Sequence, residues 1–168
     1  VRLAVDRQEL VDLVMGGAAT VACDTPVAPS DQYRLNMKCG QDINGAKKLL
    51  KEAGYPNGIE MTIHVSTKEP TWPTIAEVMQ QQLAKAGIKA DIQMTPSKSY
   101  WKETWMKKAV AMTRWNERPA DSALHEIYHS GAKWNESFYK SASFDKNLAD
   151  ARGELDFKKR KKAYQNAQ

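Results

Sequence analysis

Residues 59–94, IEMTIHVSTKEPTWPTIAEVMQQQLAKAGIKADIQM, decide the fold. Apolar and polar residues alternate over 59–65 and again over 90–94, which predicts two half-buried β-strands. Between them, apolar residues recur at helical spacing over 75–86, and Gly87 can adopt the left-handed conformation that ends a helix. Two strands joined by a helix of this length are most simply parallel. The stretch therefore predicts a strand–helix–strand unit on which the other elements pack.

The segment 109–115 is almost continuously apolar up to Thr113, which is typical of an interior parallel strand covered on both faces. Together with the helical patterns around them, these strands predict an α/β fold with a mostly parallel sheet and flanking helices. Residues 18–40 have no sustained period and predict a long ordered loop. Asp121 is predicted to cap the helix that follows the third strand.

The composition is ordinary for a globular protein, with 42% hydrophobic and 27% charged residues. A chain of 168 residues forms one domain or one large lobe with its own core. No apolar run reaches the roughly 18 residues that a membrane-spanning helix needs. The chain begins inside a helical pattern without an initiator Met, so we expect a piece of a longer protein, and the missing leader says nothing about compartment.

The net charge of +5 permits binding to nucleic acid. Much of the excess lies in the run KKRKK at 158–162, on a predicted terminal helix that also carries apolar residues. Such a run is usually a solvated helix face, and no set of aromatic or hydroxyl neighbours completes a phosphate-binding stripe. We therefore expect no nucleic-acid partner, and keep a basic nucleic-acid-binding module as an alternative.

Cys23 and Cys39 are the only cysteines. Neither has a second Cys or a His at metal-site spacing, so a zinc site at the cysteines is not expected. A bond between them would stabilise the fold by about 3 kcal/mol and would imply an oxidising compartment. From the residues alone, two free thiols remain open.

His125, Glu126 and His129 match the metalloprotease pattern H-E-x-x-H. That chemistry needs a third ligand, and no histidine follows His129. The sequence also lacks a glycine-rich phosphate loop, a nucleophile elbow and a Cys–His pair with an orienting carboxylate. We therefore expect no enzyme, no metal and no cofactor, and keep a zinc-dependent hydrolase through His125, Glu126 and His129 as an alternative.

A binding site is better supported than a catalytic one. Ligands of open α/β sheets collect beyond the carboxyl ends of parallel strands, and the loop WNER at 115–118 follows the third predicted strand. Its indole offers a flat apolar wall, and its guanidinium offers a fork for a carboxylate or phosphate. The alternative is that the indole only covers the core and the guanidinium is merely exposed. The predicted ligand-binding residues are Trp115, Asn116 and Arg118, with Trp134 and Asn135 as further candidates.

Several segments together resemble a known family. They are AVDRQEL at 4–10 with Gly16 and Gly17, the stretch from Pro26 to Ser30, AKKLLKEAGY at 46–55, and the closing residues Phe144, Asp145, Ala151, Arg152, Asp156, Arg160, Tyr164 and Gln165. In this order they are similar to the C-terminal lobe of the extracytoplasmic solute-binding proteins of peptide and nickel ABC importers, solute-binding protein family 5. The resemblance covers essentially the whole chain.

This resemblance implies that residues 1–168 are the C-terminal lobe of a two-lobed type II periplasmic binding protein, without its N-terminal lobe and final return segment. Such a protein closes around a small solute, here peptide-like or anionic, and delivers it to the ABC permease subunits in the membrane. The implied setting is periplasmic. That setting favours a disulfide between Cys23 and Cys39.

One position departs from the family pattern. In several peptide-binding members, an Asp stands three residues after the Trp that matches Trp115 and holds the ammonium group of the peptide. This chain has Arg118 there. A guanidinium repels an ammonium, so we expect Arg118 to meet a carboxylate or phosphate of the ligand, with Trp115 packing beside it.

Overall fold

The structure is a computed structural model that describes all residues from 1 to 168. It divides into two compact units, the first made of 1–21 and 39–114, the second of 22–38 and 115–168. No feature of the sequence indicated this division. No helix combines the length and the apolar character that a membrane-spanning segment requires.

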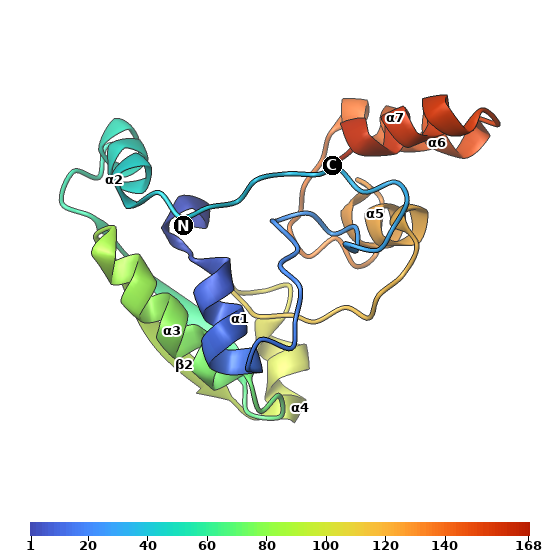
Figure 1. The fold of residues 1–168 in the computed structure, drawn as a ribbon. Helices are drawn as coiled ribbons and strands as arrows, with labels where there is room; N and C mark the ends of the chain where they lie inside the picture. The colour runs from blue at the N-terminus through green and yellow to red at the C-terminus, as the bar shows by residue number, and fades with distance from the viewer. The chain divides into compact units, whose positions relative to one another are not determined.

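The first unit is built on the predicted strand–helix–strand motif. β1 (Ile59–Ser66) and β2 (Ile88–Thr95) pair in parallel over their whole length, and α3 (Trp72–Lys85) lies along them (Figure 1). Gly87 has a φ of +83°, which ends the helix and turns the chain into β2. The predicted parallel pair and its connecting helix are confirmed.

Short capped helices complete the first unit. Asp6 accepts hydrogen bonds from two amides at the start of α1 (Arg7–Met15), and Asp42 accepts one from Gly45 at the start of α2 (Ile43–Glu52). A 3-10 turn, η1 (Arg2–Ala4), precedes α1. The core between sheet and helices consists of Ala4, Val5, Ala46, Ile63, Val65, Trp72, Ala76, Leu83, Ala86, Ile88, Ala90 and Tyr100.

The third predicted strand is reduced to one bridge. After β2 come α4 (Ser97–Ser99) and the π-helix η2 (Tyr100–Thr104), and then only Ala111 bridges to β1, parallel to His64. The prediction of a full strand over 109–115 is therefore wrong. The hydroxyl of the buried Tyr100 donates to the carbonyl oxygen of Met112, which occupies a backbone acceptor at the point where a strand would continue.

The second unit is a small helical assembly. It contains α5 (Ala120–Tyr128), α6 (Ala142–Gly153) and α7 (Phe157–Asn166), of which α6 and α7 lie side by side (Figure 1). Its core combines one residue of the loop 22–38 with residues of all three helices. These core residues are Val27, Ala120, Leu124, Phe144, Leu148, Ala151 and Tyr164.

The loop 22–38 is ordered by specific contacts, as a long loop in a compact protein requires. Cys23 and Cys39 are joined by a disulfide, which confirms the pairing that the resemblance implied. Val27 is completely buried, and Arg34 donates to the backbone carbonyls of Val27 and Ala22. The loop is therefore a fixed wall of the second unit.

Asp121 does not cap α5, so that prediction is wrong. The helix begins at Ala120, two residues before the start that a cap at Asp121 would give, and the amide of Ala120 donates over 2.9 Å to Asp31 Oδ2 of the loop 22–38. Asp121 instead accepts both arms of Arg152 at 2.7 Å and the hydroxyl of Tyr164 at 3.1 Å. The hydrogen bond from Arg152 lowers the pKa of Asp121, while burial and Asp121 raise the pKa of Tyr164 to about 12.

Candidate functional site

A cavity of about 320 Å³ in the second unit brings most of the predicted ligand-binding residues together. One wall is the loop 115–118, which supplies Trp115, Asn116 and Arg118. The stretch 25–29 of the disulfide-closed loop also lines the cavity, and α5 contributes further apolar side chains. The structure thus places an indole, an amide and a guanidinium around one cavity, which is large enough to hold part of a small solute.

The indole of Trp115 is held in place from several directions. Its Nε1 donates to Glu136 Oε1 over 3.1 Å, and its ring lies 5.9 Å from that of Trp134. The guanidinium carbon of Arg118 stands 5.0 Å from the centre of the Trp115 ring, which is a cation–π distance. Trp115 and Arg118 therefore contact each other and line the cavity together.

Arg118 is partly occupied by the chain itself. Its side chain is 25% exposed, and its Nη1 forms an ion pair with Glu126 Oε2. The other oxygen of Glu126 accepts a hydrogen bond of 2.6 Å from the Ser122 hydroxyl, one turn earlier on α5. Arg118 Nε is buried without a hydrogen-bond partner, so Nη2 is the nitrogen that is neither paired with Glu126 nor buried. The guanidinium thus lines the cavity, but one of its nitrogens is already paired with Glu126.

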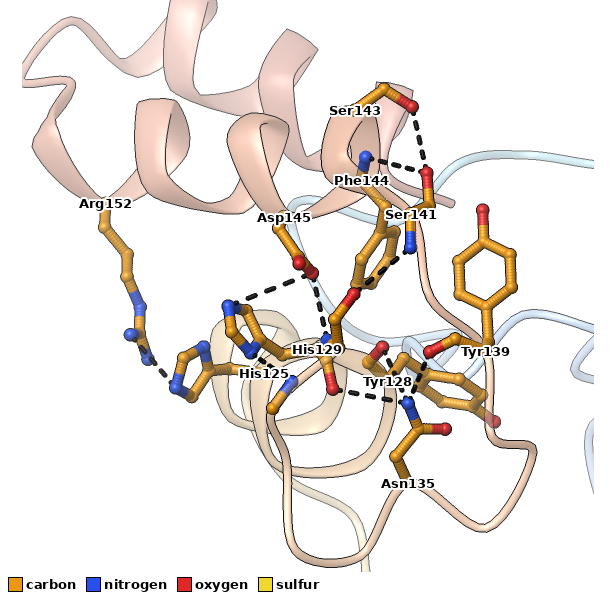
Figure 2. A network of polar contacts seen from close by, with 12 residues as sticks. His125, Tyr128, His129, Asn135, Tyr139, Ser141, Ser143, Phe144, Asp145 and Arg152 are labelled. Carbon is orange, nitrogen blue, oxygen red and sulfur yellow. Dashed lines mark hydrogen bonds and ion pairs between the residues drawn. The ribbon is translucent and has the colours of Figure 1, made fainter.

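The two further candidates lie differently. Trp134 is 40% exposed beside Trp115 and lines a neighbouring cavity of about 360 Å³. Asn135 is 5% exposed, and its Nδ2 donates to the carbonyls of Tyr128, His129 and Tyr139 (Figure 2). Asn135 therefore braces the loop after α5. A ligand contact by either residue stays a prediction.

His125 on α5 and His129, the residue that follows this helix, stand in a polar network (Figure 2). The rings of His125 and His129 are 4.7 Å apart, and His129 Nδ1 accepts the amide of Gly131 over 3.0 Å. His129 Nε2 lies 3.8 Å from Asp145, and Arg152 Nη1 lies 3.4 Å from His125 Nε2. No group of three His, Cys, Asp or Glu side chains is arranged to hold a metal ion. The zinc-hydrolase alternative therefore lacks the third protein ligand that it requires.

The chain is expected to lose stability through His125 as the pH falls below about 6.5. Burial lowers the pKa of His125 from its ordinary value of 6.5, and the charges of Arg152 and His129 lower it further. The charges of Asp121 and Glu126 raise it, but by less. The unfolded chain thus binds this proton at a higher pH than the folded chain, so protonation favours unfolding. Urea unfolding of wild type and His125→Asn from about pH 5 to pH 8 measures the effect. A decline equally steep in both would contradict it.

The basic run lies on α7. Lys158, Lys159 and Lys162 are exposed, while Arg160 and Lys161 are partly buried. The guanidinium carbon of Arg160 lies 5.6 Å from the centre of the Tyr33 ring, and Lys161 Nζ lies 6.0 Å from that of Phe157. Part of the run therefore packs on aromatic rings of its own unit.

Sequence reasoning missed the residues that hold the wall in place. Glu126 and Glu136 fix Arg118 and Trp115, yet neither stands in the loop 115–118. The spacing of Ser122 and Glu126, four residues apart on a predicted helix, was a usable signal that the two share a face. No comparable signal connects Glu136 to an indole twenty-one residues earlier.

A pocket walled by an indole and a guanidinium, in a chain with a parallel α/β unit, is an arrangement of proteins that bind small solutes. The family profile described as bacterial extracellular solute-binding proteins, family 5 Middle, matches residues 1–135. The chain belongs to this family. The expected α/β fold class, that of type II periplasmic binding proteins, is confirmed by the structural relatives.

Three relatives illustrate the likeness. The glutathione-binding protein GsiB of Escherichia coli K12 is 34% identical over 179 residues, which is 98% of this chain and 35% of that protein. GsiB of Pectobacterium atrosepticum is 29% identical over 180 residues, 98% of this chain and 34% of that protein. The periplasmic binding protein DppA of Helicobacter pylori, solved with the peptide STSA, has a TM-score of 0.88 at 30% identity over 99% of this chain and 34% of that chain. The chain thus spans about a third of the length of its relatives.

Proposed function

We propose that this chain is part of the solute-binding component of an ABC importer, which binds a small solute and delivers it to the permease in the membrane. In this proposal residues 1–168 are the C-terminal lobe, and an N-terminal lobe of the same protein completes the binding cleft. The protein works outside the cytoplasm, in the periplasm, and binds its solute without transforming it. Family membership and the relatives that bind glutathione and a peptide support this function.

The observation that carries the proposal is the cavity in which Trp115, Asn116 and Arg118 meet. The indole gives the apolar surface on which a solute packs, and Arg118 Nη2 gives a positively charged donor at its edge. We therefore propose that the solute is peptide-like and presents a carboxylate or phosphate here. Glutathione, a tripeptide with two carboxylates, and the peptide Ser-Thr-Ser-Ala are the natural probes.

In the complete protein, Arg118→Ala is expected to weaken glutathione binding by about tenfold to a hundredfold, because a charge-assisted hydrogen bond contributes roughly 1.5–3 kcal/mol. Isothermal titration calorimetry measures the change. Arg114→Ala is the matched control, since Arg114 is 67% exposed and pairs with Glu69 in the first unit. The proposal predicts an unchanged affinity in this control. Equal affinity in wild type and Arg118→Ala would refute a ligand contact by Arg118.

A further inference from the structure

A bidentate contact between an arginine and a ligand anion uses either the donor pair Nη1 and Nη2 or the pair Nε and Nη2. In Arg118 both pairs are compromised. Nη1 is bound to Glu126, and Nε is buried, out of reach of a solute in the cavity. As folded, Nη2 is therefore the guanidinium nitrogen of Arg118 that is neither paired with Glu126 nor buried, and it is free to meet a carboxylate or phosphate.

The carboxylate of Glu126, which pairs with Arg118, is itself held in place by a hydrogen bond. Ser122 donates to Glu126 Oε1 at 2.6 Å, so the carboxylate is fixed from its own helix while Oε2 faces the guanidinium. The Trp115 ring holds the guanidinium from another side, since the guanidinium carbon lies 5.0 Å from the ring centre. A solute anion that accepts from both Nη1 and Nη2 must therefore compete at Nη1 with a carboxylate that is already in place.

We infer that Glu126 is a specificity-determining residue of this pocket, which competes with the anionic group of the solute for the guanidinium of Arg118. The competition lowers the affinity for carboxylates and phosphates, and it favours solutes that gain enough contact elsewhere to release Nη1. Ser122 acts as a positioning residue, because it orients the competing carboxylate. This inference rests on the proposed function of the pocket and names the group that sets its charge preference.

The first test does not need a solute. Phenylglyoxal modifies accessible guanidinium groups, and peptide mass spectrometry of the complete protein gives the rate at Arg118 relative to Arg114 in the same sample. We expect Glu126→Gln to raise this relative rate several-fold, and Ser122→Ala to raise it less. Asp150→Asn, which removes an exposed carboxylate paired with Lys146, should leave it unchanged. An unchanged rate in both Glu126→Gln and Glu126→Ala overturns the inference.

The second test measures glutathione binding by calorimetry. Glu126→Gln is expected to bind about tenfold more tightly than wild type, because one charge-assisted hydrogen bond no longer has to be broken. A merely structural role of Glu126 would weaken binding instead, and such weakening, or no change, overturns the inference. If wild type binds neither glutathione nor Ser-Thr-Ser-Ala, the proposed function fails for these solutes, while the modification rates still decide whether Glu126 withholds Arg118.

Discussion

Gly58→Ala is expected to lower the free energy of unfolding by on the order of 4 kcal/mol, the largest effect of any single change considered for this chain. Gly58 has a φ of +89°, a region that side chains rarely adopt. A Cβ built there would stand 1.9 Å from the carbonyl oxygen of Gly87. That same oxygen accepts the amide of Ile59 at the start of the strand pair. The added methyl group must therefore push β1 and β2 apart at their first hydrogen bond.

Gly54→Ala is the matched control. Gly54 has nearly the same φ, +88°, but nothing lies within 4 Å of a Cβ built there. Only the backbone strain remains, which is worth roughly 1–2 kcal/mol. Urea unfolding of both variants, with hydrogen exchange of the amides of Ile59–Ser66 as a local readout, separates strain from collision. Equal losses in the two variants would show that the close approach of Gly58 to Gly87 does not matter.

Replacing both cysteines by serine is expected to cost about 3 kcal/mol, because the disulfide closes a loop of roughly 15 residues and restricts the unfolded chain accordingly. The effect should be concentrated in the second unit. The loop 22–38 carries the buried Val27, the carboxylate of Asp31 that caps α5, and one wall of the cavity. Loss of the disulfide is therefore expected to weaken the packing of Val27, the capping of α5 by Asp31 and the lining of the cavity together.

The double variant Cys23→Ser, Cys39→Ser and the reduced wild type should behave alike in thermal unfolding. Hydrogen exchange of the Ala120 amide, which donates to Asp31, should become faster in both. The control is Asp31→Asn in the oxidised protein, which weakens the same hydrogen bond but keeps the closed loop. If the double variant melts at the wild-type temperature, the non-covalent contacts of the loop are sufficient to hold it, and the disulfide contributes nothing measurable.

The strand–helix–strand motif could be predicted because its signals are local. The alternation of 59–65, the helical spacing of 75–86 and the position of Gly87 each depend on neighbouring residues only. The prediction of a third strand was wrong because strand formation there depends on Tyr100, which lies outside the segment. The Tyr100 hydroxyl donates to the carbonyl oxygen of Met112. An apolar run shows that a segment is attractive to the core, but not which partner satisfies its backbone.

The candidate site, too, could be predicted only in part. The loop WNER was found from its place after an apolar segment, and the structure brings Trp115, Asn116 and Arg118 to one cavity. The sequence could not reveal that Glu126 partly neutralises the charge of Arg118, because this ion pair forms only in the folded unit. The charge of a binding site is a property of the folded neighbourhood, so the residue type at one position is an incomplete guide to the ligand.

The composition of the second unit has a consequence for biosynthesis. Val27 leaves the ribosome long before Leu124, Leu148 and Tyr164, with which it shares a core. Residues 39–114, which belong to the first unit, are synthesised in between. Val27 therefore cannot be buried before α5, α6 and α7 have been synthesised, and contacts of such long sequence separation form slowly. During this interval the apolar residues of the loop 22–38 are open to non-specific association.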